Sequence, residues 1–310
     1  MKFEKIAVIG AGIMGHGIAQ VLAQAGKQVI LNDISEQMLS SAQEKIRAGI
    51  QLLVDNGMYC AQAVDAAMDR IFYSTDLAAV GDADLIIEVV PERWDIKEKL
   101  YQKLAGISKK NAVWASNTSG MPINKLAALT DRPELFVGAH FFMPAHLVPL
   151  VEVIQGDATK LEVVQALMAL LQEAGKSPVH VKMDIPGFIG NRLQHALARE
   201  AMSLLQKGVA SAADIDTVVK TSLAVRLVFT GPIEQRDLNG LDTHLSIAEY
   251  LYKDLENTTV PLATLSDKVK DGRLGLKSGA GFYDWSHTTQ AVVAAQKNQQ
   301  LIDMVKMLKK

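Results

Sequence analysis

The fold of this chain is decided by residues 6–15, Ile-Ala-Val-Ile-Gly-Ala-Gly-Ile-Met-Gly, an apolar run that leads straight into three spaced glycines. An apolar helical stretch follows at residues 18–25 and ends at Gly26. In a strand, turn and helix of this kind, the first glycine permits the tight turn and the second lets the backbone approach a phosphate. The third lets the helix pack closely on the strand, and the free N–H groups at the helix start favour an anion.

The residue that ends the next strand-like run indicates which dinucleotide binds. Residues 28–32 form that run, and Asp33 follows it. A carboxylate there accepts hydrogen bonds from the adenosine ribose and repels a 2′-phosphate, so the sequence predicts NAD in preference to NADP. The alternative is a plain glycine turn with a solvated aspartate, but the strand before and the helix after give the motif the context that it requires. The predicted cofactor residues are Gly10, Gly12, Ile13, Met14, Gly15 and Asp33.

Outward from this motif, the chain divides into two patterns. Up to residue 183, short apolar runs alternate with amphipathic stretches, which is typical of a parallel sheet with helices on both faces. The candidate strands are residues 6–9, 29–31, 85–90, 112–115, 136–139, 150–154 and 179–181. After Pro186, helical segments near 187–206, 213–222, 233–255 and 261–271 are separated by Gly or Pro. We therefore expect an α/β protein, with a Rossmann-type doubly wound sheet at 1–183 followed by an all-helical domain at 184–310.

Length and composition limit the class of protein. The 310 residues allow two domains of about 150 residues each. The net charge of −2 offers no basic field for nucleic acid, and the Lys-rich end at Lys306, Lys309 and Lys310 is too short to supply one. The single cysteine, Cys60, excludes an internal disulfide and a Cys-based zinc site, and no metal site is predicted. With no secretory leader and no apolar run near the ~18 residues of a membrane span, we expect a cytoplasmic protein that does not bind membranes.

Polar residues follow several of the predicted strands, where an α/β sheet presents ligands. They are the stretch Ser116-Asn117-Thr118-Ser119, then His140, then Glu152 within its strand. Each could equally be a packed or a surface residue when taken alone. Together they suit oxidation of an alcohol by NAD, which needs a base for the hydroxyl proton, and neutral His is the side chain best matched to pH 7. A carboxylate on its other nitrogen would fix the tautomer.

The stretch 184–192, Asp-Ile-Pro-Gly-Phe-Ile-Gly-Asn-Arg, followed by Glu200-Ala201, resembles the signature of the 3-hydroxyacyl-CoA dehydrogenase family. The resemblance extends over nearly the whole chain. It implies that Ser119 contacts the substrate, that His140 is the general base, that Glu152 is the carboxylate paired with it, and that Asn191 binds the substrate.

The same resemblance implies further roles. Glu92 and Lys97 match positions that contact NAD in the family, Lys277 matches a lysine close to the cofactor, and Asn117 is assigned to the cofactor site. It also implies NAD-dependent interconversion of 3-hydroxyacyl and 3-ketoacyl compounds, a place in fatty acid metabolism, and a homodimer formed by the C-terminal helices, whose apolar content is high.

Departures from the family pattern lie on the substrate side. Gly120 replaces a second serine, and Met143 replaces an asparagine. Asp55 ends a helix where members that bind coenzyme A carry lysines for its phosphates, unless the alignment shifts in this variable hairpin.

Two arginines bear on the same question. Arg226, shortly before Gly231-Pro232, resembles the lambda-crystallin and carnitine dehydrogenase branch, which oxidises free hydroxy acids. The planar guanidinium of Arg226 or Arg236 could pair with a carboxylate, or either could face solvent. The sequence thus leaves three functions open: a dehydrogenase of a CoA thioester, a dehydrogenase of a free small hydroxy acid, and a non-catalytic NAD-binding structural protein.

Overall fold

The computed structural model describes residues 1–308, so Lys309 and Lys310 of the Lys-rich end lie outside the described residues. The chain divides into two compact units. The first consists of residues 1–191 together with residues 296–308, and the second of residues 192–295. This division differs from the predicted domains, because the signature stretch at 184–191 and the last helix both belong with the first unit.

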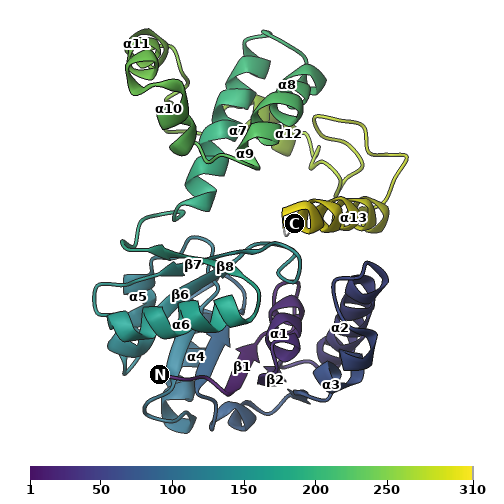
Figure 1. Ribbon diagram of the computed structural model, residues 1–310, viewed down its shortest axis with the longest axis vertical. Helices are drawn as coiled ribbons and strands as arrows, with labels where there is room; N and C mark the ends of the chain where they lie inside the picture. Colours follow the sequence, from purple (N-terminus) through teal and green to yellow (C-terminus); the bar gives the residue numbers. More distant parts are fainter. Residues whose placement is uncertain (309–310) are drawn as a thin grey trace. The chain divides into compact units, whose positions relative to one another are not determined.

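The first unit is built on one eight-stranded sheet, with the strand order β3-β2-β1-β4-β5-β6-β7-β8. Figure 1 shows this sheet among the helices of the unit. The α/β, Rossmann-type prediction is confirmed. The strands are β1 (Lys5–Ile9), β2 (Gln28–Asn32), β3 (Ile71–Ser74), β4 (Leu85–Glu88), β5 (Val113–Ser116), β6 (Phe136–Phe141), β7 (Leu150–Ile154) and β8 (Ser177–Val181).

Two features of the sheet differ from the prediction. The edge strand β3 was not predicted, because four residues with the exposed Phe72 in second place show no buried run. In addition, β7 pairs with β6 antiparallel and β8 follows the direction of β7, so the sheet is not parallel throughout. The physical reason is the length of the connection: residues 142–149 are too few for the crossover that parallel neighbours need.

The side chains of alternate strand residues enter two separate cores. On β1, Ile6 and Val8 join one core, whereas Ala7 and Ile9 join the other. The first face is covered by α1 (Gly15–Gln24), α2 (Glu36–Asp55), α3 (Val64–Met68) and α6 (Leu161–Glu173). The second is covered by α4 (Trp94–Ile107) and α5 (Ile123–Ala127). Helices on both faces explain why the strands are apolar on both sides.

The second unit is helical, as predicted. It continues α7 (Gly190–Gln206) and contains α8 (Ala212–Val218), α9 (Ala224–Leu227), α10 (Glu234–Asn239), α11 (Leu241–Leu251) and α12 (Ala263–Lys270). A π-helical turn at Val219–Leu223 joins α8 to α9. The helix predicted at 233–255 is divided into α10 and α11 at Gly240, whose φ of 91° ends α10. Among residues 1–308, no helix is long and apolar enough to cross a membrane.

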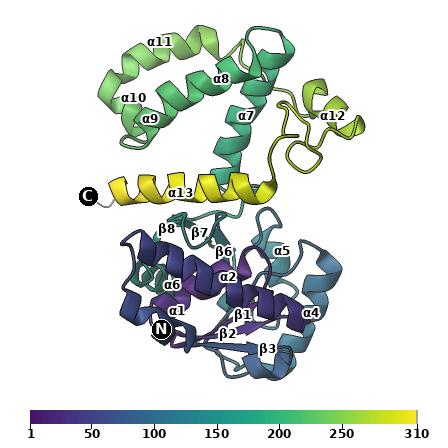
Figure 2. The same ribbon diagram turned by 90° about the vertical axis from the view of Figure 1, so that its right-hand side faces the viewer.

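The last helix, α13 (Gln290–Leu308), was not predicted from the sequence. From residue 296 it belongs to the first unit, where it lies near α2 (Figure 2). There Ile302 is fully buried against Leu53 of α2 and Leu147 of the β6–β7 connection. Only Ile302 and Val305 of this long, glutamine-rich helix are buried. Two buried residues give too weak an apolar period to indicate a helix, or its partner, from sequence.

Candidate active site

The turn between β1 and α1 contains three glycines. At two of them a side chain would clash with the backbone, and the remaining one faces open space. Gly10 has φ 108°, and a Cβ there would lie 2.7 Å from the carbonyl oxygen of Val89. A Cβ on Gly15 would lie 1.7 Å from the carbonyl oxygen of Gly10. A Cβ on Gly12 would meet nothing within 4 Å. The first and third glycines therefore shape the turn, while the second leaves room for a ligand's phosphate to approach the backbone.

Asp33 ties this turn to the end of β2. Its Oδ2 accepts the N–H of Ala11 at 2.8 Å, and its Oδ1 accepts the N–H of Ser35 at 3.1 Å. A carboxylate has about four acceptor positions, so capacity remains for ribose hydroxyls. Helix α1 begins here with Met14 at its N-cap, which offers no capping oxygen, so first-turn N–H groups are left to an anion. Ile13 is exposed beside them. The residues thus fit a dinucleotide.

His140 and Glu152 lie directly opposite each other on the antiparallel strands β6 and β7. The Nδ1 of His140 lies 2.8 Å from Oε2 of Glu152, and both residues are almost fully buried. The other carboxylate oxygen, Oε1, accepts the backbone N–H groups of Ile189 at 2.9 Å and Gly190 at 2.8 Å. The unpredicted reversal of strand direction is therefore what places the predicted base beside its predicted carboxylate.

The charge of Glu152 sets the tautomer of His140. Burial alone would raise the pKa of Glu152, but the hydrogen bonds from His140, Gly190 and Ile189 outweigh burial and hold that pKa below its ordinary value. Glu152 is therefore ionised at neutral pH and can only accept hydrogen bonds. The proton of neutral His140 consequently sits on Nδ1, and Nε2 is left as the basic nitrogen.

The signature stretch at 184–192 forms part of the environment of His140 and Glu152. Phe188, at φ 49°, and Phe142 pack on the His140 ring, with ring centroids 5.7 and 4.5 Å away. A Cβ on Gly190 would lie 2.5 Å from the Phe142 ring, so only glycine fits there. The turn at 187–190 thus aims two N–H groups at Glu152 and places the Phe188 ring on the imidazole, while Phe142, just after β6, supplies the second ring.

Ser119 and Asn191, the two predicted substrate contacts, lie together in the first unit. The Nδ2 of Asn191 donates to the carbonyl oxygen of Ser119 at 3.0 Å, and the Ser119 side chain is exposed. Asn117 connects this segment to the base, because its Oδ1 accepts the N–H of Phe141, next to His140, at 2.8 Å. Asn117 and Ser119 follow the carboxyl end of β5, and Phe141 ends β6, at the edge where such sheets bind ligands, whereas Asn191 lies in the first turn of α7.

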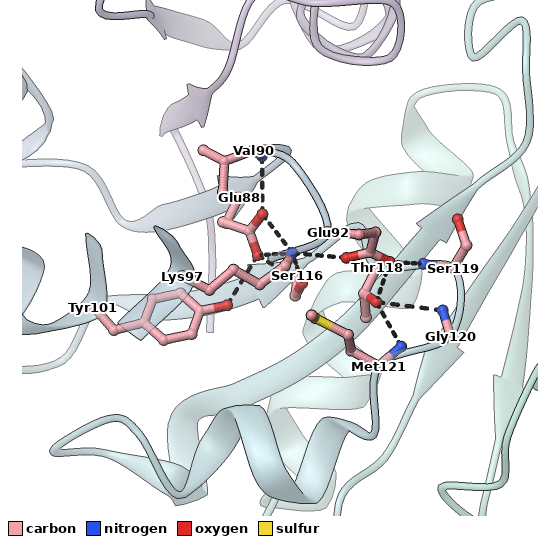
Figure 3. A network of polar contacts seen from close by, with 10 residues as sticks. All are labelled: Glu88, Val90, Glu92, Lys97, Tyr101, Ser116, Thr118, Ser119, Gly120 and Met121. Atoms are coloured by element: carbon pink, nitrogen blue, oxygen red, sulfur yellow. Dashed lines mark hydrogen bonds and ion pairs between the residues drawn. The ribbon is translucent and has the colours of Figure 1, made fainter. Parts of the chain in front are cut away.

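A buried network under this segment joins the predicted Lys97 to Glu88 and Tyr101, two residues that the sequence did not single out (Figure 3). Lys97 Nζ contacts both oxygens of Glu88 at 2.8 Å, and both side chains are at most 2% exposed. Glu88 also accepts the hydroxyls of Tyr101 at 2.9 Å and Ser116 at 2.7 Å. The signal that could have found Glu88 is an acidic residue inside an otherwise apolar predicted strand, a position that must be paired when buried.

The network reaches the substrate segment through Glu92. Its Oε2 lies 3.2 Å from Lys97 Nζ, and its Oε1 accepts the Thr118 hydroxyl and the Ser119 N–H. Burial would raise the pKa of Glu92, but the contacts with Thr118, Lys97 and Ser119 outweigh burial and lower that pKa. Glu92 is 44% exposed, so it can reach a bound cofactor. Lys97 is 1% exposed, and its geometry suits holding Glu92 better than contacting NAD directly.

The remaining predicted residues belong to the second unit. Arg226 lies on α9 and Arg236 on α10, and both are exposed. The Nη2 of Arg226 donates to the hydroxyl of Ser222 at 3.2 Å. Lys277 is exposed in the segment after α12. Across residues 1–308, no three His, Cys, Asp or Glu side chains gather as metal ligands.

Two family models match the chain. The NAD binding domain of 3-hydroxyacyl-CoA dehydrogenase matches residues 5–185, and the C-terminal domain of 3-hydroxyacyl-CoA dehydrogenase matches residues 187–285. The chain is thus an NAD-dependent dehydrogenase acting on CH–OH groups, and its cofactor is NAD.

Individual proteins agree with these models. The 5-formyl-3-hydroxy-2-methylpyridine 4-carboxylate 5-dehydrogenase of Mesorhizobium japonicum is 33% identical over 306 residues, 98% of each chain. A crystal structure of an enzyme of that name, described as an NAD+ dependent dismutase, superposes with a TM-score of 0.93 at 33% identity and covers 99% of each chain.

A second solved structure is that of (S)-3-hydroxybutyryl-CoA dehydrogenase from Ralstonia eutropha. It is 34% identical, with a TM-score of 0.77, and the match covers 92% of this chain and 99% of that one. The two matched domains show that this chain belongs to the 3-hydroxyacyl-CoA dehydrogenase family.

Proposed function

We propose that the protein interconverts a 3-hydroxyacyl compound and the corresponding 3-ketoacyl compound, using His140 as its general base. The observation that carries this proposal is the buried contact of 2.8 Å between His140 and the ionised Glu152, which leaves Nε2 as the basic nitrogen beside the carboxyl ends of the strands. A buried carboxylate that holds an imidazole in one tautomer is the arrangement of a general base and its partner.

The chemistry follows from these contacts. When bound, NAD supplies the acceptor for the hydride that leaves the alcohol carbon. Nε2 of His140 takes the hydroxyl proton, and Glu152 stabilises the imidazolium that forms. In the reverse direction, Nε2 returns that proton to the oxygen of the ketone. Ser119 and Asn191 orient the substrate oxygen, and Glu92 and Asp33 bind hydroxyls of the cofactor.

The acyl compound of the family is a CoA thioester, and a free small hydroxy acid is the second candidate. Asp55 at the end of α2 favours the free acid, because a carboxylate there repels phosphates. Arg226 favours it as well, since its exposed guanidinium can make two parallel hydrogen bonds to a carboxylate. It lies three residues after a π-helical turn, and such turns frequently occur at functional sites.

The second unit supports a homodimer, which we include in the proposal. Large apolar side chains are exposed on α9, α10, α11 and the segments beside them: Phe229, Ile233, Leu238, Leu241, Leu245 and Tyr252. Exposed apolar surface on this scale marks an interaction site, and isologous pairing is the commonest arrangement of soluble homo-oligomers.

The activity is tested by following NADH consumption with a panel of 3-keto compounds, both free acids and the CoA thioester acetoacetyl-CoA. We expect NADH to be consumed with at least one member and NADPH to be used far less well. A folded protein that binds NADH but consumes none with any 3-keto compound would contradict the proposal.

A further inference from the structure

A histidine follows Gly15 directly, at the start of α1. The Nδ1 atom of His16 lies 2.7 Å from the carbonyl oxygen of Gly12. The backbone N–H of His16 is 3.4 Å from the same oxygen, beyond the usual range of about 2.7–3.2 Å for such a hydrogen bond. The imidazole therefore makes the main contact with this carbonyl. Because a carbonyl oxygen only accepts hydrogen bonds, Nδ1 carries the proton.

This contact fixes the direction of a neighbouring hydrogen-bond donor. The Gly12 carbonyl and the Ile13 N–H belong to one planar trans peptide, so they point in opposite directions. A Cβ on Gly12 would meet nothing within 4 Å, and Ile13 is 70% exposed. The peptide thus lies at the open side of the turn, where phosphates are bound by backbone N–H groups. Its orientation is set from the helix side by the His16 imidazole.

The helix start that carries His16 packs directly on the connection between β6 and β7. A Cβ on the adjacent Gly17 would lie 3.2 Å from the Cβ of Ala145 and 3.4 Å from Nδ1 of His146. Glycine at this position therefore lets residues 145–146 approach the backbone of α1 closely. Packing this tight restricts the movement of the helix start, and His16 with it.

Both imidazoles are predominantly neutral at pH 7. Burial lowers the pKa of His16 below its ordinary value, and Lys45 of α2 lowers it further, although the hydrogen bond to Gly12 opposes them. Burial also lowers the pKa of His146 to about 4, with smaller contributions from His16 and from Lys176, which precedes β8. His16 is therefore a neutral donor to Gly12 and carries no charge that would attract a phosphate.

We propose that His16 is a positioning residue for the cofactor: its Nδ1–H holds the Gly12 carbonyl and thereby presents the Ile13 N–H to the pyrophosphate of NAD. This role concerns cofactor binding alone. It therefore does not depend on which acyl compound the enzyme oxidises, nor on His140 as the base.

The test is calorimetry of NAD binding to the unmodified protein, His16→Ala and His16→Asn. Loss of the donor in His16→Ala should weaken binding about two- to tenfold, the effect of one hydrogen bond. Asparagine places an amide nitrogen where Nδ1 lies, so it should restore most of the affinity. The protein already contains such a contact, because Nδ2 of Asn56 donates to the carbonyl oxygen of Leu52, four residues before it, at 2.9 Å.

Two controls separate positioning from other effects. His180→Ala removes a histidine of the first unit that lies outside the turn, on β8, and should leave the affinity unchanged. The affinity should also have the same pH dependence between about pH 6.5 and 8 in the unmodified protein and in His16→Asn, since a neutral donor acts in both. If His16→Ala does not fold, His16→Gln replaces it, because its amide corresponds to Nε2 and not to Nδ1.

Each other outcome overturns the inference. The affinity of folded His16→Ala could equal that of the unmodified protein, or His16→Asn could bind no better than His16→Ala. Binding that tightens at lower pH in the unmodified protein, but not in His16→Asn, would show attraction by a charged imidazole instead of positioning. Intact NAD binding without turnover of any 3-keto compound would contradict only the proposed function and leave this role of His16 standing.

Discussion

The two oxygens of Glu152 have separate tasks. Oε2 accepts the proton-bearing Nδ1 of His140, while Oε1 holds the N–H groups of Ile189 and Gly190. The carboxylate therefore sets the tautomer of the base and also fixes the turn that covers it. A neutral amide here could still accept N–H groups, but more weakly, and it carries no charge to stabilise the imidazolium, so Glu152→Gln should weaken both catalysis and local structure.

Replacing His140 by Ala should reduce turnover by about 10²–10⁴-fold, the usual contribution of a general base. The affinity for NAD should be nearly unchanged, because the cofactor residues of the β1–α1 turn are untouched. Steady-state NADH consumption and calorimetry measure the two effects. His180→Ala is a matched control. The imidazole of His180 lies 2.9 Å from the side chain of Gln155 and takes no part in the His140–Glu152 contact. Near-normal turnover in the His140 variant would remove His140 from the mechanism.

Replacing Asp33 by Ala should weaken NAD binding by about 1.5–3 kcal/mol, the range for hydrogen bonds to charged groups. The preference over NADP should narrow, because the charge that repels a 2′-phosphate is lost. Glu36→Ala, an exposed acidic residue three positions further on, is the control. Calorimetry with both dinucleotides decides, and an unchanged NAD affinity would show that Asp33 serves only to hold Ala11 and Ser35.

Site residues could be predicted where they belong to a sequence motif. They could not be predicted where only the fold brings them together. His140 and Glu152 were singled out as a base and its carboxylate, and the strand register now places them in contact. Lys97 was assigned from resemblance as a cofactor contact, which stays a prediction; it is 1% exposed and paired with Glu88, and we propose a positioning role for it. Glu88 escaped prediction because its partners lie up to 28 residues away and become visible only in three dimensions.

At the scale of elements, strands β6 and β7 show that a sequence pattern can locate a strand without giving its direction. Alternating apolar runs located both strands, since buried strands are apolar whatever their direction. Direction depends on the connection between them, and the eight residues at 142–149 allow only an antiparallel return. Strand β3 and helix α13 were missed for a related reason: each buries few side chains, so neither shows a clear period.

The ion pair between Lys97 and Glu88 holds helix α4 on the sheet. Replacing Lys97 by Met should lower the free energy of unfolding by about 3–5 kcal/mol, because Glu88 would be left as a buried charge without its cation. Urea unfolding measures this loss. Adding Glu88→Gln to the Lys97 variant should recover part of it, and Lys99→Met, exposed on the same helix, should cost little. Equal losses in the two lysine variants would contradict this account.

At the scale of the whole molecule, several carboxyl groups couple folding to pH. The pKa values of Asp84, Glu92, Asp131 and Glu152 lie below their ordinary values, because hydrogen bonds and nearby cations outweigh the opposing effect of burial. A carboxyl group with a lowered folded-state pKa stabilises the protein above its unfolded pKa, about 4. That stabilisation is lost as the pH falls through the folded-state value.

These carboxyl groups should therefore hardly change the melting temperature between pH 7 and 6. The melting temperature should fall steeply as the pH drops below about 4. Differential scanning calorimetry across this range measures the effect. The Glu152→Gln variant should be less stable at neutral pH and should show a shallower acid decline. A decline of the same steepness in that variant would show that Glu152 contributes nothing to it.

The exposed apolar helices of the second unit predict a dimer in solution. Light scattering at micromolar concentration should give about twice the mass of the 33.6 kDa chain. Leu241→Lys with Leu245→Lys, on the exposed face of α11, should shift the mass toward one chain and leave NAD binding intact. A single-chain mass for the unmodified protein would refute the dimer.

The return of α13 to the first unit makes residues 192–295 an insertion within that unit's sequence. During synthesis, the ribosome must complete the whole insertion before Ile302 can pack against Leu53. Until then, the end of α2 lacks its contacts with α13. The insertion is also tethered covalently at both ends. A single protease cut within it therefore leaves two fragments that the contacts of α13 still hold together.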